Sequence, residues 1–462
     1  MSTQTVDQIE FLSLPSGKAE GKHHIVIVGA GIIGVCTAYY LTKHASFDPS
    51  KHHITVLESK RVAGGASGKA GGLLATWAFP QQIVPLSFQL HQELSDEYNG
   101  EQEWDYRRLI TVSLEADVQN VGDASDADVS QKAYNLKVPP PKKKKRCAQT
   151  GSDDKHGSDA DDESDEHEIE YNNLKMSSSD RDTSLPVDLN WIRTQLVKDW
   201  SSLGGTDSTA QVHPYKFTHF LLNEAMKTGA VDLILGKVDE IKFNDMGCAC
   251  GVSYVPTADD DQQDQEPVEI LDTQHVVLAM GPWTSKILPD CPISGLRAHS
   301  ITIKPSTGTV SPYAIFTELK VGKNKYFSPE MYARKDEVYV CGEGDTLVEL
   351  PETSDAVEVV REKCDELYQY VSKLSPNLSQ GHILKRQACY LPVLNVPTSS
   401  GPLIGETNLE GLYVASGHSC WGINNAPATG KIMSELLLDG EVKSADISAL
   451  DPGLYFDASV LE

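Results

Sequence analysis

Short apolar runs alternate with stretches of helical periodicity over most of the chain. Residues 25–28 form an apolar run of strand length, residues 32–44 repeat apolar positions at helical spacing, and residues 54–57 are apolar again. A strand, a helix and a second strand in this order make a βαβ unit, in which the helix crosses over between two parallel strands. The pattern therefore predicts an α/β arrangement.

The same alternation continues toward the C-terminal region. Further strand-like runs lie at residues 231–235, 250–255, 268–271, 275–279, 301–304, 338–341 and 412–415. Helices are predicted at residues 216–228, 357–374 and 428–438. The acidic run 259–266 separates two strand-like pieces and predicts a long hairpin tip. No internal repeat accompanies this alternation.

The apolar periodicity disappears between residues 116 and 185, where Asp, Ser, Lys and Glu dominate. Ten residues between positions 151 and 170 are acidic, and a basic run of four lysines and one arginine follows Pro141, at residues 142–146. Such a composition buries too little apolar surface to offset the entropy of ordering. We therefore predict an acidic, disordered insertion at residues 117–185 that is available to protein partners. The basic run is either a nuclear-import signal or solvated charge.

Composition narrows the class of protein. A length of 462 residues exceeds what one hydrophobic core supports, so two packed domains are expected. The net charge of −26 argues against nucleic acid as a partner, because phosphate binding requires a basic surface. Glycines and polar residues interrupt the longest apolar run, at residues 25–41, so no membrane span is expected.

The cysteines and the N-terminal residues bear on location and metal binding. Nine scattered cysteines, an odd number, fit reduced thiols better than a disulfide framework, and residues 1–22 lack the pattern of a secretory signal. Cys248 and Cys250 are close together, but no second Cys/His pair flanks them at zinc-ligand spacing, so no metal is predicted. We expect a cytoplasmic protein, with nuclear import as an alternative.

The first predicted strand runs into a glycine pattern that is typical of dinucleotide binding. Gly29 permits a tight turn, Gly31 lets the backbone approach a pyrophosphate, and Gly34 allows close helix packing. The N-terminus of the following helix favours an anion through its N–H groups and its dipole. Glu58 ends the second strand, where a carboxylate takes the ribose hydroxyls and disfavours NADP. Because the glycine pattern follows a strand, precedes a helix and is followed by an acid at the end of the second strand, it strongly predicts a dinucleotide-binding site.

Two further segments favour FAD over NAD. Residues 64–73 are rich in glycine and alanine and offer backbone amides to a diphosphate and a flat ring. A ligand that consists of a single nucleotide would not need this second set of backbone amides. The last predicted strand leads into residues 416–427, rich in Gly, Ser and Asn, with Pro427 near the start of a helix. The positive end of that helix can stabilise the negative charge that builds on a reduced flavin.

These segments carry a family resemblance. Residues 412–430 are similar to the C-terminal flavin signature of glycine oxidase and sarcosine oxidase, and residues 29–34 and 65–72 match the same family. From about residue 24 to residue 438, the chain resembles the FAD-dependent D-amino-acid oxidase, glycine oxidase and sarcosine oxidase family. Within it, the chain is similar to a fungal branch of amine oxidoreductases, which implies a possible location at endosomes.

The resemblance implies an α/β fold with a two-dinucleotide-binding, glutathione-reductase-like FAD domain and a second α+β substrate domain built on an antiparallel sheet. Its predicted pieces are a flexible N-terminus (1–22), FAD-binding parts (23–100, mainly 186–290, and 386–446), substrate-domain parts (101–116 and 291–385), the acidic insertion (117–185) and a C-terminal tail (447–462).

The residues predicted to bind FAD come from the motifs and from the resemblance. They are Gly29, Gly31, Ile32, Ile33, Gly34, Glu58, Ser59, Lys60, Gly65, Ala66, Ser67, Lys69, Ala70, Gly71, Gly72, Leu73, Val238, Ala279, Gly281, Trp283, Gly417, Cys420, Trp421, Gly422 and Ile423. Val238, Ala279 and Gly281 are included because the resemblance implies that they neighbour the cofactor.

The sequence departs from its family on the substrate side. Amino-acid oxidases of this family hold the substrate carboxylate with arginine, because a bidentate fork orients the carbon that gives up hydride. The two corresponding positions are Leu391 and Cys420 in this chain. Arg297, Arg334 and Arg386 remain as candidates for a relocated clamp, against the alternative of a structural ion pair.

Tyr332, Trp421 and Arg386 are the residues predicted for the catalytic site, with ordinary packing as the alternative for the two aromatic residues. The predicted reaction oxidises a C–H bond next to nitrogen in a small amine or amino-acid-like substrate, by hydride transfer to FAD. Without the arginines, a bulkier or less charged amine is expected to fit better than a simple amino acid. The alternatives are a dehydrogenase that passes electrons to a partner, and a flavin-stabilised scaffold in endosomal traffic.

Overall fold

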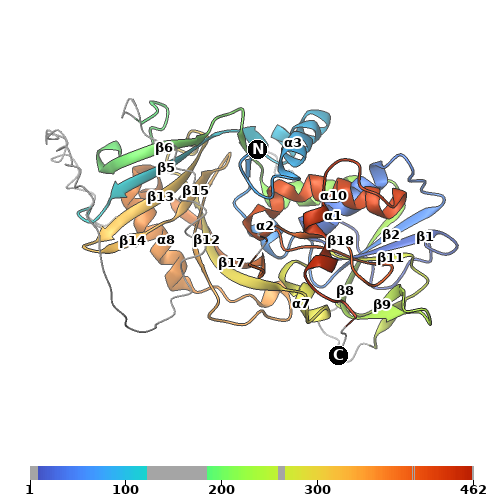
Figure 1. Cartoon of the computed structure of the whole chain (residues 1–462). Coiled ribbons are helices and arrows are strands. Elements are labelled where there is room, and N and C mark those ends of the chain that lie inside the picture. Colours follow the sequence, from blue (N-terminus) through green and yellow to red (C-terminus); the bar gives the residue numbers. More distant parts are fainter. Residues whose placement is uncertain (1–8, 122–184, 259–265, 398, 400, 460–462) are drawn as a thin grey trace, which may run out of the picture.

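The computed structural model describes residues 9–121, 185–258, 266–397, 399 and 401–459. The predicted insertion at 117–185 and the acidic hairpin tip therefore lie almost wholly outside the described residues. Figure 1 shows two halves, each built around a sheet, with β17 (His382–Leu394) and β12 (Ile293–Lys304) lying where the halves meet.

The first sheet has the order β10-β9-β8-β2-β1-β11-β19-β18. Its parallel strands are β1 (His23–Val28), β2 (His52–Glu58), β8 (Val231–Phe243), β11 (His275–Leu278) and β19 (Leu412–Ser416), and its antiparallel strands are β9 (Ala249–Pro256), β10 (Val268–Ile270) and β18 (Leu403–Glu406). In β1, Ile25 and Ile27 enter one core while Val26 and Val28 enter another. Burial on both faces explains the uninterrupted apolar run in the sequence.

Four helices pack into the core on one face of this sheet: α1 (Ile32–Lys43), α3 (Val84–Tyr98), α6 (Pro214–Met226) and α10 (Gly422–Asp439). Helices α1 and α10 approach closely at Gly430, where a Cβ would lie 2.5 Å from the backbone of Cys36. Since α1 follows β1 and α10 follows β19, both helices begin at the carboxyl edge of the parallel strands.

Helix α10 begins earlier than predicted and contains Pro427 in its interior rather than in its first turn. A proline there cannot donate a backbone hydrogen bond to the carbonyl of Ile423, four residues earlier. The buried side chain of His91 takes that role, because its Nε2 donates to Ile423 O at 2.9 Å. This substitute bond explains how the helix continues through the proline.

The second sheet has the order β17-β12-β16-β15-β13-β5-β6, with β14 paired to β13. The remaining bounds are β5 (Ile110–Asp117), β6 (Val197–Gly204), β13 (Tyr313–Gly322), β14 (Lys325–Phe327), β15 (Glu330–Ala333) and β16 (Val338–Asp345). All its neighbours are antiparallel except β13 and β5. Helix α8 (Arg361–Leu374) covers one face and starts after residues 357–360, which were predicted to be helical.

A three-stranded sheet of β3 (Leu73–Ala75), β7 (Thr209–Gln211) and β4 (Arg107–Arg108) continues from the second glycine-rich segment. The short helices are α2 (Ala66–Lys69), α4 (Gly100–Glu103), α7 (Thr284–Ile287) and α9 (Pro376–Ser379). In the described ranges, no helix is both long and apolar enough to cross a membrane.

Part of the N-terminal segment that was predicted to be flexible is packed on the first sheet. Leu12 forms a parallel bridge with Ile234, and Ser13 O accepts a hydrogen bond from Tyr254 Oη at 2.9 Å. Lys18 pairs with Asp232 at 2.8 Å. These contacts correct the prediction for residues 9–22, and residues 1–8 lie outside the described residues.

Candidate cofactor and substrate site

A cavity of about 350 Å³ lies at the carboxyl ends of the parallel strands. Open α/β sheets bind ligands at this edge. The predicted cofactor residues that line the cavity are Gly29, Gly31, Ile32, Ile33, Glu58, Ser59, Gly65, Ala66, Ser67, Ala70, Val238, Ala279, Gly281, Trp283, Cys420, Gly422 and Ile423. The fold thus brings together residues from all the predicted motifs.

The first glycine turn is shaped by close backbone contacts. Gly29 has a φ of +108°, and a Cβ there would lie 2.5 Å from the carbonyl oxygen of Ala279. Gly34 lies behind the cavity wall, where a Cβ would meet Gly29 O at 2.0 Å. The backbone N–H of Ile32 donates to Ser67 Oγ at 2.9 Å, which ties the start of α1 to the second glycine segment. Both segments therefore form one continuous wall.

Glu58 is fixed at the end of β2 by backbone donors. Its Oε2 accepts from the N–H of Ala30 at 3.0 Å, and its Oε1 accepts from the N–H of Lys60 at 3.0 Å. Burial raises the pKa of this carboxyl, and the two backbone hydrogen bonds lower it. Lys60 therefore contributes its backbone to the carboxylate and does not line the cavity.

The second glycine segment passes from the cavity wall to the second sheet. Gly72 has a φ of +91°, and a Cβ there would lie 2.1 Å from Val212 O. A Cβ on Gly71 would lie 2.1 Å from Cδ2 of Tyr332. Lys69 does not line the cavity, and its Nζ donates to Ala388 O at 3.0 Å. Like Leu73 in β3, these predicted cofactor residues do not line the cavity.

The segment between β19 and α10 turns through two left-handed residues, Gly417 at a φ of +87° and Ser419 at +51°. His418 lies between them, and its Nε2 is 3.0 Å from Thr429 Oγ1. Burial lowers the pKa of His418 to about 3, so the ring is neutral near pH 7 and has a structural role. The turn places Gly422, the first residue of α10, in the cavity wall.

Sequence reasoning missed a segment from the second half that contributes to the cavity wall. Residues 346–359 connect β16 toward α8, and we call them the strap. Glu352 lines the cavity and pairs with Lys237 at 2.6 Å and Lys286 at 2.7 Å, while Trp283 Nε1 donates to Pro351 O at 2.7 Å. No glycine pattern marks the strap, and the predicted helical periodicity covers only its last three residues, 357–359, so the sequence carried no signal for its position.

Tyr332 and Trp421 do not line the cavity but belong to an aromatic cluster beside it. Its ring centroids form a chain from Trp421 to Trp77 (5.3 Å), Phe316 (6.1 Å), Tyr332 (6.0 Å) and Tyr339 (5.8 Å). We call these five residues the aromatic cluster.

The structure contradicts the prediction that Arg386 holds a substrate. Its Nε and Nη2 donate to Oδ1 of Asp365 on α8, at 2.9 and 2.6 Å. In the sheet, Arg386 lies opposite Ile301, whose side chain packs into the core under α8. Side chains alternate between the faces of a strand, so Arg386 points away from the cavity.

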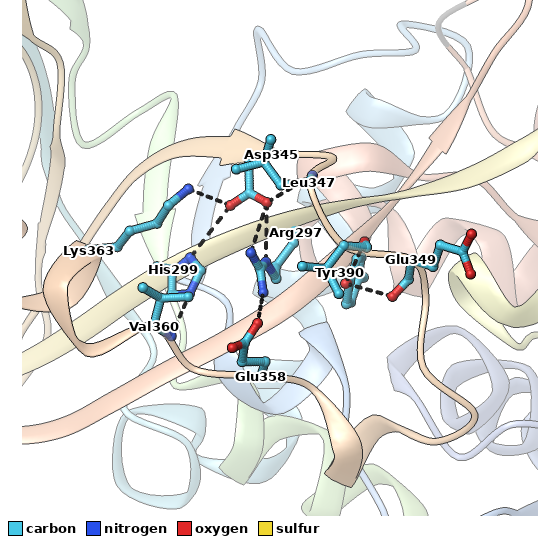
Figure 2. A network of polar contacts seen from close by, with 10 residues as sticks. Arg297, His299, Asp345, Leu347, Glu349, Glu358, Val360, Lys363 and Tyr390 are labelled. Carbon is cyan, nitrogen blue, oxygen red and sulfur yellow. Dashed lines mark hydrogen bonds and ion pairs between the residues drawn. The ribbon is translucent and has the colours of Figure 1, made fainter.

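The other two candidate arginines are engaged in ion pairs, and the Arg334 guanidinium also lies over the ring of Tyr339, 5.0 Å from its centroid. Arg297 pairs with Asp345 at 3.0 Å and with Glu358 at 2.8 Å, as Figure 2 shows. Arg334 pairs with Glu337 at 2.7 Å, and its Nε donates to Gly71 O at 3.2 Å. In the cavity wall that the described residues form there is no arginine, and Leu391 and Cys420 both lie in that wall.

The donors of the cavity wall fit FAD. The N-termini of α1 and α10 both reach the wall, and helix N-termini stabilise the anionic diphosphate and the negative charge of a reduced flavin. Glu58 supplies a carboxylate for ribose hydroxyls at the first nucleotide. The wall extends from there to Leu391, Cys420 and Ile423, further than a single nucleotide requires.

Comparison with known proteins agrees with this geometry. The family described as "FAD dependent oxidoreductase" (DAO) matches residues 24–436. The Saccharomyces cerevisiae protein named "Putative oxidoreductase TDA3" is 60% identical over 513 aligned positions, which cover 98% of each chain. Iminodiacetate oxidase from Chelativorans sp. BNC1 has a similar structure, with a TM-score of 0.61 and 16% identity, covering 93% of this chain and 99% of that one. Glycine oxidase from Geobacillus kaustophilus gives 0.60 and 15%, covering 93% and 98%.

The two solved structures show the fold, and the family match shows the cofactor. The predicted α/β fold and the prediction of FAD are thereby confirmed. The chain belongs to the DAO family of FAD-dependent oxidoreductases.

Proposed function

We propose that the protein oxidises a C–H bond next to nitrogen in an amine that carries no carboxylate on the reacting carbon. FAD, when bound, supplies the acceptor for the hydride. Two solved proteins of similar fold are named for oxidation of iminodiacetate and of glycine, which supports a nitrogen-bearing substrate.

The absence of arginine from the described cavity wall is the observation that carries the proposal. A substrate carboxylate buried without a matched cation loses several kcal/mol of solvation that nothing returns. Leu391 and Cys420 supply no positive charge at the wall, and the two lysines of the wall, Lys237 and Lys286, are both paired with Glu352. A simple amino acid would therefore bind poorly.

The chain's own residues have separable tasks in this reaction. The N-terminus of α1 and Glu58 would hold the diphosphate and a ribose, and the N-terminus of α10 would face the flavin. The aromatic cluster would exclude water next to the reacting carbon and orient the substrate by ring contacts.

Anaerobic mixing of the FAD-loaded protein with two sets of compounds tests the proposal. Glycine, sarcosine, D-alanine and D-proline form one set, and N-methylbenzylamine with other secondary and aryl amines forms the other. We expect loss of the flavin's visible absorbance with one or more amines and none with the amino acids. Fast bleaching by a small amino acid, or no bleaching by any amine, would refute the proposal. Readmission of air then distinguishes an oxidase, which reoxidises quickly, from a dehydrogenase.

A further inference from the structure

One face of the second sheet contacts the glycine-rich segment that borders the cofactor cavity. Glu330 and Tyr332 lie two residues apart on β15, so their side chains share a face, and their partners across the strand pair are Cys341 and Tyr339. Tyr332 and Tyr339 both lie against Gly71, next to Ala70 in the cavity wall. This face of β15 and β16 therefore points toward the cavity and away from α8.

The aromatic cluster on this face borders the cavity at two points. Ala70 lines the cavity directly before the glycine that Tyr332 contacts. At the other end, Cys420 and Gly422 line the cavity on either side of Trp421 in the chain. The rings therefore adjoin the part of the cavity where α10 begins, which is the part expected to hold the flavin.

Glu330 places a carboxyl group at the edge of these rings. It accepts hydrogen bonds from Tyr332 Oη and from Cys341 Sγ, the latter at 3.7 Å. Phe316 lies opposite it on β13. Among the described residues, no lysine, arginine or histidine forms an ion pair with Glu330. Burial raises the pKa of this carboxyl, and the contacts with Tyr332 and Cys341 lower it.

Two polar groups of the aromatic cluster also lack a partner in the part of the chain that the structure describes. The indole Nε1 atoms of Trp77 and Trp421 are buried and find no acceptor among the described residues. Trp421 is 6% exposed, so solvent does not satisfy its N–H group. Buried indole donors usually find an acceptor, so a ligand that completes the cluster would supply one from a part of the molecule other than its cationic nitrogen.

We propose that Glu330 and the aromatic cluster form the binding site for the substrate's nitrogen, and that the substrate is a cationic amine. The ammonium pairs with the Glu330 carboxylate and lies on the aromatic faces, which attract cations through their negative quadrupole. This inference rests on the proposed amine oxidation and names the charge of its substrate.

Glu330 also prepares the nitrogen for oxidation. One N–H bond of the ammonium breaks, an O–H bond forms on the carboxylate, and the nitrogen keeps the electron pair that a C=N bond requires. The transfer cancels both charges within the buried site. A carboxyl with a raised pKa is a better proton acceptor than one in water, which favours this step.

The test uses the FAD-loaded protein and benzyltrimethylammonium, a permanent cation whose nitrogen has no electron pair, so that it binds without being oxidised. Benzyl methyl ether is the neutral comparison, and binding is followed by the shift in the flavin's visible spectrum. We expect the wild-type protein to bind the cation about 10- to 100-fold more tightly than the ether, the range for a charged contact.

The variants separate charge from structure. Glu330→Gln keeps the shape and should lose most of this preference, whereas Glu330→Asp keeps the charge and should retain part of it. Glu318→Gln is the matched control, because Glu318 is exposed on β13 of the same sheet. It should behave as wild type. Equal affinity for the cation in Glu330→Gln, or no preference for the cation in the wild-type protein, would overturn the inference.

The two proposals fail in different ways. If the cation binds through Glu330 but no amine bleaches the flavin, the amine oxidation is refuted and the cation site stands. If N-methylbenzylamine bleaches the flavin of wild type and of Glu330→Gln with the same affinity and rate, the cation site is refuted and the oxidation stands.

Discussion

Replacing Arg297 with methionine should loosen the strap over the cofactor cavity. The Arg297 guanidinium joins the two ends of the strap, because Asp345 ends β16 and Glu358 lies near the start of α8 (Figure 2). Between these ends, Tyr390 Oη donates to Val348 O at 3.0 Å. Methionine keeps the approximate length of the side chain but removes both ion pairs.

The expected loss of stability follows from the burial of the three charges. Breaking a fully buried ion pair costs about 3–5 kcal/mol, because the remaining charge is left unpaired. In the variant, the Asp345 side chain, which is 9% exposed, still pairs with the ammonium group of Lys363. The Glu358 side chain is 62% exposed, so water solvates its charge. We therefore expect a smaller loss, about 2 kcal/mol, of the free energy of unfolding.

Arg386→Met is the matched control. Arg386 lies on the same face of the same sheet, but its pair with Asp365 is half exposed, so its loss should be below about 1 kcal/mol. Urea unfolding measures the stability, and the appearance of free FAD fluorescence after dilution measures release. We expect Arg297→Met to release FAD faster than wild type and Arg386→Met to match wild type. Equal stability and equal FAD release in the two variants would refute the assignment of Arg297 as the anchor of the strap.

Three further outcomes are expected. Glu58→Ala should weaken FAD retention about 10- to 100-fold in ultrafiltration, because a carboxylate hydrogen bond is worth about 1.5–3 kcal/mol, and unchanged retention would contradict the ribose assignment. His91→Phe should lower the free energy of unfolding by about 1–3 kcal/mol by leaving Ile423 O unpaired in the core; a urea midpoint equal to that of wild type would refute this. Burial lowers the pKa values of His24 and His275 to about 4, so their contribution to stability is intact above pH 6.5 and is lost as the pH falls toward 4. The urea midpoint should therefore be lower at pH 5 than at pH 7, and a higher midpoint at pH 5 would exclude this linkage.

The cofactor half was predictable because its constraints are local in sequence. Gly29 must take a positive φ beside Ala279, and Glu58 must end the second strand, so both leave a pattern that short-range reasoning detects. The parallel strands are buried on both faces and therefore appear as uninterrupted apolar runs. The same local logic failed at Pro427, because the bond that allows it inside α10 comes from His91, far away in the chain.

The substrate half was harder to predict because strand parity decides which residues reach the cavity. A shift of one residue moves a side chain to the opposite face of a sheet, and the sequence near Arg386 does not fix the parity of β17. The strap posed a second difficulty, because its position depends on ion pairs of Glu352 with Lys237 and Lys286 from distant segments. Neither constraint produces a periodic pattern.

If the amine site that we propose is correct, the electrostatics of the substrate side differ in sign from those of a carboxylate-binding site. Leu391 and Cys420 occupy the wall without a positive charge, and Glu330 adds a carboxylate beside the aromatic cluster. A carboxylated substrate would meet a like charge in a partly buried site and would lose its hydration without compensation. A cationic amine would instead find an opposite charge and aromatic faces, both of which strengthen as water is excluded. The same fold would here select an amine through its nitrogen.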